Sequence, residues 1–151
     1  GKVCSWRIRF FTNEKGTTES EYLLDAVWEK VHADRILCLA LRGDRLYSGS
    51  EDQTIRVIDT TKKEVLLNAT IQCTGRIHSL FVSETRIFAS DSNDSLLVWN
   101  RQNTSGVIQI LKGPGRVHCL ATDEVGRLYS GGDSSVQVWD HVPSKSVVSF
   151  V

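Results

Sequence analysis

The chain has 151 residues, enough for one ordinary domain, and its 18 basic and 18 acidic residues give a formal net charge of zero. This balance excludes a strong overall attraction to nucleic acid or to an anionic membrane. A hydrophobic content of 40 % with 24 % charged residues is typical of a soluble folded protein. The apolar runs are far shorter than the roughly 18 residues that span a bilayer, so we expect no membrane association.

The beginning of the chain and its cysteines bear on its origin. No charged and apolar leader opens the sequence, which predicts no signal peptide. The chain contains no methionine and begins with Gly1, so we interpret it as a piece of a longer polypeptide.

None of its four cysteines forms a CxxC pair, and Cys38 and Cys119 lie in apolar runs. We expect small buried apolar residues rather than zinc ligands, and an intracellular location, cytoplasmic or nuclear.

In chain order, the first predicted elements form an incomplete set. The runs "GKVCSWRI" (1–8) and "EYLLDAV" (21–27) resemble two strands, and the longer polar connection "FFTNEKGTTESE" (10–21) joins them. The periodicity of "ESEYLLDAVWEKVH" also fits an amphipathic helix. However, residues 21–27 match "EVLLNAT" (64–70) almost residue for residue, which favours a strand.

Three further sets of strand-like runs follow, with a period of about forty residues. Each run is short and rich in β-branched and aromatic residues, and polar turns separate the runs. Four strands joined by short turns predict an antiparallel meander, and because a lone meander cannot bury both faces, neighbouring meanders must stack. The matching runs are 35–41, 76–82 and 116–122; 45–50, 86–91 and 127–132; 54–59, 95–100 and 135–140; and 64–70, 106–111 and 146–151.

The period and the ends of the third runs, Ile58-Asp59, Trp99-Asn100 and Trp139-Asp140, resemble the WD-repeat β-propeller family over the whole chain. The resemblance implies an all-β WD-repeat β-propeller of about three and a half four-stranded antiparallel blades, as part of a ring of about seven blades. Residues 1–31 would form the outer two strands of one blade, and residues 32–71, 72–112 and 113–151 would each form a blade. The remaining blades would then come from the parent chain or from a second polypeptide.

The family also implies a buried hydrogen-bond network in each blade. Its members are a tryptophan in the third strand, a serine or threonine in the second, a histidine before the first, and an aspartate in the tight turn. Each copy here lacks at least one member, which puts the rigidity of the blades in doubt. The first full copy has His32, Ser48 and Asp52 but Ile58 in place of tryptophan; the second has Asn93 and Trp99 but Ala89 in place of serine and no histidine; the third has Ser130, Asp133 and Trp139 but no histidine.

No motif for catalysis, phosphate binding or metal binding occurs in the sequence. His78 and His118 both fall in first strands, and no set of ligands accompanies them, so we interpret them as half-buried strand histidines. We therefore predict no active site, no cofactor and no metal. Gly49, Gly131 and Gly132 fit close approach of the backbone in the second strand or its turn.

Two triplets of arginine recur in register with the repeats. The antiparallel connections place the residues before the first strands and those before the second strands on opposite faces. Arginines of the second triplet have acids in their own hairpins (Asp44, Glu84 and Asp123-Glu124), and we expect them to form weak surface pairs. The first triplet has only Asp34 beside it. The triplets are Arg35, Arg76 and Arg116, before the first strands, and Arg45, Arg86 and Arg127, before the second.

We hypothesise that Arg35, Arg76 and Arg116 form an arc that binds an acidic or phosphorylated segment of a partner, because the guanidinium fork suits carboxylates and phosphates. The alternative is that they only solvate the rim or pair with acids of the neighbouring turns. Those acids include Glu51, Asp52 and Asp94.

The function that fits best is a non-catalytic protein–protein interaction scaffold within a multiprotein complex, although a fold does not determine a function. One alternative is a nucleic-acid-binding subunit of a ribonucleoprotein, with arginines and the strand aromatics Tyr47, Phe88 and Tyr129 stacking on bases. The zero net charge argues against it. Another alternative is the regulatory propeller of a larger enzyme.

Overall fold

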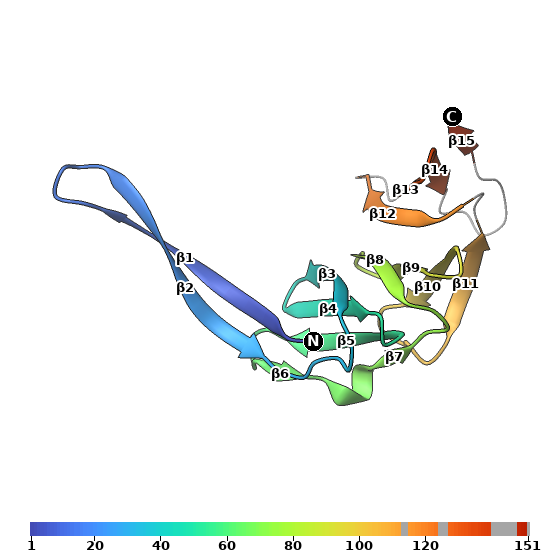
Figure 1. The fold of residues 1–151 in the computed structure, drawn as a ribbon, viewed down its shortest axis with the longest axis horizontal. Helices are drawn as coiled ribbons and strands as arrows, with labels where there is room; N and C mark the ends of the chain where they lie inside the picture. Colours follow the sequence, from blue (N-terminus) through green and yellow to red (C-terminus); the bar gives the residue numbers. More distant parts are fainter. Residues whose placement is uncertain (113–114, 124–126, 140–147, 151) are drawn as a thin grey trace.

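The computed structural model describes residues 1–112, 115–123, 127–139 and 148–150. These residues form antiparallel β-sheets and one short 3-10 helix, and the sheets with four or more strands stand side by side like the blades of a fan (Figure 1). The all-β fold predicted from the sequence is confirmed. No helix in the described part of the chain has the length and apolar character needed to cross a membrane.

A two-stranded sheet, β1 (Val3–Thr12) with β2 (Thr18–Trp28), opens the chain. Three blades follow, in which consecutive strands pair in chain order, except that β7 pairs with β5. The first blade contains β3 (Ile36–Arg42), β4 (Arg45–Ser50), β5 (Thr54–Asp59), β6 (Glu64–Val65) and β7 (Ile71–Gln72); the second contains β8 (Ile77–Val82), β9 (Arg86–Asp91), β10 (Ser95–Asn100) and β11 (Val107–Lys112); the third contains β12 (Val117–Thr122), β13 (Leu128–Gly132), β14 (Val136–Trp139) and β15 (Val148–Phe150).

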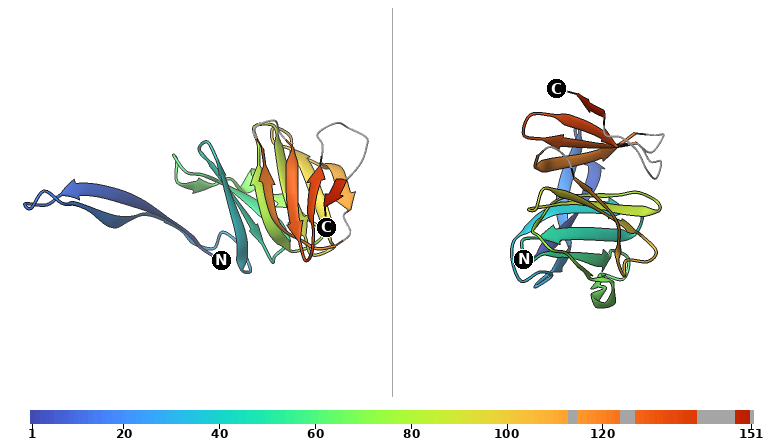
Figure 2. Two further views of the ribbon diagram at one scale, coloured as in Figure 1. Left: turned by 90° about the horizontal axis from the view of Figure 1, so that it is seen from above. Right: turned by 90° about the vertical axis from the view of Figure 1, so that its right-hand side faces the viewer.

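The β1–β2 hairpin differs from expectation in its length. Residues 21–27 are a strand, as the repeat match predicts. The predicted polar connection over residues 10–21 is instead mostly strand, because β1 continues to Thr12 and β2 starts at Thr18. Asn13 closes the short turn, since its side-chain oxygen accepts hydrogen bonds from the backbone N–H groups of Lys15 and Thr17. The outer part of the hairpin therefore projects away from the blades (Figure 2).

A β-bulge divides this hairpin into two parts. Ser5 pairs with Ala26 and Trp6 with Leu24, so Asp25 has no partner across the strand. Its carboxylate forms an ion pair with Arg7 at 2.8 Å and lies 3.4 Å from the Lys63 ammonium, which reaches over from the first blade. The hydrogen bond from Lys63 is the largest cause that lowers the pKa of Asp25. The bulge is thus also the point at which charged groups tie the hairpin to the propeller.

The fourth strand of the first blade is irregular. Residues 64–70 were expected to form one strand, but the segment is split into β6, a 3-10 turn over Leu67–Ala69, and β7. Both β6 and β7 still pair with β5. Leu67 in the turn is 71 % exposed, whereas Ile71 of β7 is buried in the cluster that the first two blades share.

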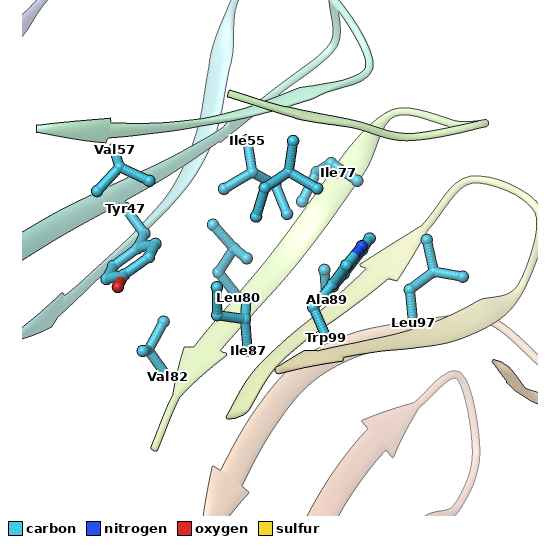
Figure 3. Packing of buried hydrophobic residues seen from close by; sticks show 11 residues of the cluster. Tyr47, Ile55, Val57, Ile77, Leu80, Val82, Ile87, Ala89, Leu97 and Trp99 are labelled. Carbon is cyan, nitrogen blue, oxygen red and sulfur yellow. The ribbon is translucent and has the colours of Figure 1, made fainter. Parts of the chain in front are cut away.

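The core lies between the blades rather than within one of them. One cluster joins Tyr47, Ile55 and Val57 of the first blade to residues of the second, among which Ile87 and Trp99 are almost fully buried (Figure 3). A smaller cluster joins the second blade to the third, and another joins the base of the hairpin to the first blade. Each meander buries its faces only against its neighbours, as the repeat pattern predicts.

The expected close approach at glycines in the second strands is confirmed. A Cβ atom on Gly49 would lie 2.5 Å from Cγ2 of Ile77 in the next blade. On Gly131 it would lie 2.6 Å from the Cys119 sulfur, and on Gly132 it would lie 2.6 Å from the Arg116 carbonyl oxygen. Side chains at these positions would therefore push the first strands or the blades apart.

The cysteines follow the expectation only in part. All four are free. Cys38 and Cys73 are half-buried, and burial is the largest cause that raises the pKa of each thiol to about 12. Cys4 and Cys119 are exposed instead of buried. The apolar run around Cys119 is misleading, because successive side chains of a strand point to opposite faces and the sulfur falls on the open side of β12.

Candidate protein-interaction face

The predicted site residues Arg35, Arg76 and Arg116 precede β3, β8 and β12, and they share a local geometry. In the first two blades the backbone carbonyl of the arginine accepts a hydrogen bond from the turn between the second and third strands. The Glu51 N–H donates to the carbonyl oxygen of Arg35 at 3.0 Å, and the Ser92 N–H donates to the carbonyl oxygen of Arg76 at 2.9 Å. The Ser50 hydroxyl also donates to the Arg35 carbonyl at 2.7 Å. The turn thus fixes the backbone of the arginine while its side chain stays outside.

The side chains of these arginines are exposed and paired with acids. Arg35 donates from Nε to Glu51 at 2.9 Å, whereas Arg76 Nη1 lies 3.9 Å from the other oxygen of the same carboxylate. Arg116 Nε lies 3.8 Å from Asp94. Their side chains are 79 %, 61 % and 55 % exposed, in chain order. The pairs of Arg76 and Arg116 cross a blade boundary, since each acid belongs to the preceding blade.

The pairing acids are two of the three that the alternative interpretation named, Glu51 and Asp94. Asp52 instead points inward and binds His32. Because the arginine side chains are largely exposed, such ion pairs contribute about 0 to 1 kcal/mol each, so they orient the arginines without holding them tightly. Whether this face binds a partner stays a prediction.

The second arginine triplet behaves largely as expected. Arg45 lies 3.1 Å from the buried Asp59 and 3.7 Å from Asp44, and Arg127 donates to Asp123 at 2.6 Å. Glu84 does not pair with the neighbouring Arg86. It lies instead against Arg42 of the first blade and Arg101, so the acid links two blades. Glu124 lies outside the described residues.

The first blade has three members of the predicted network in contact. His32 is buried, with Nδ1 3.0 Å from Asp52 Oδ2 and Nε2 2.8 Å from the Ser48 hydroxyl. Thr54 is a fourth member that the sequence did not indicate, because its hydroxyl lies 3.0 Å from His32 Nδ1 and donates to Asp52. Burial is the largest cause that lowers the pKa of His32. A neutral ring with its proton on Nδ1 donates to Asp52 and accepts from Ser48.

The second blade organises its turn around another residue. Asp91 is buried and accepts hydrogen bonds from the backbone N–H groups of Asn93 and Ser95. Asn93 lies at the repeat position of the network aspartate, and its side-chain amide donates to Asp91 at 3.3 Å. An aspartate at the end of the second strand was the signal that could have identified this centre.

The third blade holds the other half of the network. Trp139 donates from its indole N–H to the Ser130 hydroxyl at 2.8 Å. Asp133 does not point into the blade, since it pairs with His118 at the surface, with 2.6 Å between the nitrogen and the oxygen. The histidine half and the tryptophan half therefore occur in different blades, with the serine common to both.

The remaining candidates are the strand aromatics and the histidines. Tyr47 and Phe88 are buried in the clusters between blades, so they cannot stack on bases, and Tyr129 donates its hydroxyl to Asp123. Within the described ranges, no three residues among histidines, cysteines and acids lie close enough together to hold a metal ion. Of the two histidines interpreted as half-buried, His78 is half-buried, whereas His118 is exposed.

Comparisons with known proteins agree with this architecture. The "WD domain, G-beta repeat" family matches residues 27–59 and 105–140. No curated protein matches the chain. Among solved structures, the RRP9 WD40 repeats align with a TM-score of 0.71 at 22 % identity, over 85 % of this chain and 41 % of that one.

Two further structures give the same result. U3-55K aligns with a TM-score of 0.66 at 23 % identity, over 79 % of this chain and 38 % of that chain. The WD40 β-propeller domain of Doa1 aligns with a TM-score of 0.71 at 16 % identity, over 89 % of this chain and 47 % of that chain. The chain thus spans less than half the length of the propellers that it matches. Together with the three stacked blades, these matches support the resemblance seen in the sequence: the chain contains WD repeats and has a β-propeller fold.

Proposed function

We propose that the chain is part of a non-catalytic scaffold for protein–protein interaction, and that the face with Arg35, Arg76 and Arg116 binds an acidic or phosphorylated segment of a partner. The observation that carries this proposal is that the guanidinium groups of Arg76 and Arg116 are exposed and only loosely paired. Arg76 and Arg116 contact acids only at 3.8–3.9 Å and form no side-chain hydrogen bond within the described residues, whereas Arg35 shares the Glu51 carboxylate with Arg76.

A bound carboxylate or phosphate gains from this arrangement in two ways. It can form short charge-assisted hydrogen bonds with donors that are not fully used, and these bonds are stronger than neutral ones. It also displaces only weak pairs, so little stabilisation of the propeller is lost. The firm backbone anchoring of Arg35 and Arg76 keeps the positions of the groups fixed before the partner arrives.

The test compares binding of a glutamate-rich peptide and a phosphoserine peptide to the 151-residue chain and to the double variant Arg76→Ala/Arg116→Ala. We expect the double variant to bind at least roughly tenfold more weakly, because two charge-assisted contacts are lost. The melting temperature should stay the same. Fluorescence anisotropy of labelled peptides measures the affinity.

Arg86→Ala is the matched control, since it removes an arginine from the opposite face, where β9 begins. It should leave the affinity unchanged. Equal losses in the control and the double variant would show only a general effect of positive charge. Unchanged binding in the double variant would contradict the proposal.

A further inference from the structure

The third blade has a pocket at the place where the first blade has a buried histidine. In the first blade, the fully buried side chain of His32 lies against the Ser48 hydroxyl and the Asp52 carboxylate. In the third blade, the residues at the positions of Ser48 and Asp52 line a pocket of about 130 Å³ instead. Its lining includes Arg116, Ser130, Asp133, Ser135 and Gln137.

The strand pairing supports the equivalence of the two places. Ser48 pairs with Arg56 across β4 and β5, and Ser130 pairs with Gln137 across β13 and β14. The third blade therefore has a shorter, uncharged side chain where the first has an arginine. His32 stands three residues before Arg35, and the residue three before Arg116 is a glycine. This copy of the repeat thus supplies no side chain of its own at the histidine position.

The pocket lies on the side of the third blade that faces the second blade. Side chains two residues apart in a strand point to the same face, so Ser130 and Gln137 share a face with Leu128 and Trp139. The latter two pack in the cluster with the second blade. Ser130 and Gln137 are only 1 % and 4 % exposed, whereas the side chains at the rim, such as Arg116, are more than half exposed. The pocket therefore has a buried floor and an open mouth.

The floor offers one hydrogen-bond acceptor and one donor to a ligand. Oε1 of Gln137 is buried and has no hydrogen-bond partner among the described residues. Folded proteins pair nearly all such groups, so this oxygen indicates a ligand that donates a hydrogen bond. The Ser130 hydroxyl accepts the indole N–H of Trp139 at 2.8 Å, and its own proton is bonded to no described residue. It can therefore donate to the same ligand.

The charges at the rim select a neutral ligand. Arg116 stands at the mouth, so a cationic side chain would be repelled. Asp133 at the rim already pairs with His118, with 2.6 Å between the nitrogen and the oxygen. An anion would face this carboxylate and the Gln137 oxygen. A neutral imidazole avoids both conflicts, because it carries one N–H donor and one nitrogen acceptor in the same ring.

We infer that this pocket binds the neutral imidazole of a histidine from a partner protein. One ring nitrogen donates its proton to Oε1 of Gln137, and the other accepts the proton of the Ser130 hydroxyl. The ring is held as His32 is held in the first blade, between a hydroxyl and an acceptor. The pocket shares Arg116 with the arginine face, but the inference does not rest on the proposed function, because its ligand carries no charge.

Imidazole itself is the first probe, at about pH 8, where most of it is neutral. Nuclear magnetic resonance of the 151-residue chain follows the indole N–H of Trp139, which reports on Ser130. We expect a saturable shift of this signal, with a dissociation constant on the order of 1–10 mM for so small a ligand. In 1-methylimidazole a methyl group replaces the N–H, so this compound should bind at least roughly tenfold more weakly.

Two variants locate the binding site. Gln137→Leu removes the acceptor and should weaken the binding of imidazole at least roughly tenfold. It should leave the protein folded, because it removes a buried polar group that has no partner. Gln109→Leu is the matched control: it changes an exposed glutamine of β11 in the second blade and should leave the affinity unchanged.

A blocked Gly-His-Gly peptide distinguishes a partner's side chain from a free heterocycle. It should shift the same indole signal with an affinity no weaker than that of imidazole, and Gly-Ala-Gly should leave the signal in place. Binding of imidazole but not of the peptide would overturn the assignment to a partner and point to a small heterocycle.

Other results would overturn the inference as a whole. Absence of a shift at about 100 mM imidazole would mean that the pocket holds only solvent. Equal affinities for imidazole and 1-methylimidazole, or for the wild type and Gln137→Leu, would mean that Gln137 accepts no hydrogen bond from the ligand. Tighter binding of methylguanidinium than of imidazole would assign the pocket to a cationic side chain.

Discussion

At the scale of single residues, the polar network of the first blade is stable because its parts complement one another. His32 is buried, yet both of its ring nitrogens have partners, and the Asp52 carboxylate also accepts the N–H of Ala33 at 3.0 Å. Burial disfavours the charged imidazole more than Asp52 favours it, so the pKa of His32 is lowered. Ile58 replaces tryptophan without an orphaned group, because Ser48 has His32 as its partner.

This network predicts a pH dependence of stability. Since the pKa of His32 is lower in the folded protein than its ordinary value of 6.5, the unfolded chain binds more protons as the pH falls through 6.5. The free energy of unfolding should therefore decrease between pH 7.5 and 5.5. The variant His32→Gln should lack this part of the decrease, whereas the other histidines contribute equally to both proteins.

Urea unfolding at both pH values provides the measurement. The pKa of Asp52 is also lowered, but its contribution changes only at more acidic pH and does not interfere in this window. Equal decreases in the wild type and the variant would show that His32 does not titrate differently on folding.

At the scale of elements, the hairpin has a base that packs and an arm that does not. Trp28 is only 6 % exposed and belongs to the cluster with Ile58, whereas Phe10, near the tip, is 69 % exposed. Two strands alone are marginally stable in water, so the base and the Asp25 contacts hold the hairpin in place. The mutational sensitivity of the hairpin should therefore be concentrated at one end.

We predict that Trp28→Ala lowers the free energy of unfolding by about 3–5 kcal/mol, the range for large core truncations. Phe10→Ser should change it by no more than about 0.5 kcal/mol, since the side chain makes no core contact. Denaturant titration followed by circular dichroism compares the two variants. A large loss for Phe10→Ser would mean that the arm packs on the protein in solution.

At the scale of the whole molecule, stability is held at the contacts between blades. The first and second blades share the largest cluster, and Arg101 of the second blade also donates to the Tyr47 hydroxyl at 3.3 Å. These two blades should behave as one cooperative unit, as expected for repeats with strong neighbour contacts.

The variant Ile87→Ala tests this coupling, because Ile87 belongs to the second blade but lies in the shared cluster. This variant should lower the free energy of unfolding by about 2–5 kcal/mol. Hydrogen exchange should report the loss in β4 and β5 of the first blade as well as in β9 and β10. A loss confined to the second blade would show that the blades unfold independently.

The sequence predicts the blades well because their pattern repeats in register. Three copies of strand, turn and strand identify the core positions, and the match of residues 21–27 with 64–70 correctly selects a strand over a helix. The sequence does not predict side-chain partners that are set by contacts between blades. Nothing local indicates that Glu84 pairs with Arg42 and Arg101, or that Thr54 joins the histidine network. The acids that pair with Arg76 and Arg116 belong to the preceding blade, and the register of the repeats had to be used to name Glu51 and Asp94 as candidates.

The bulge at Asp25 changes how the sequence of β2 should be interpreted. Trp28 and Leu24 are four residues apart, and a regular strand would place them on the same face. The unpaired Asp25 reverses this phase, so Trp28 is buried against the first blade while Leu24 is 53 % exposed on the other side. Even-numbered positions of β2 are thus exterior before the bulge, at Tyr22 and Leu24, and interior after it, at Ala26 and Trp28. The apolar pattern of one strand therefore serves two surfaces, one within the propeller and one available to other molecules.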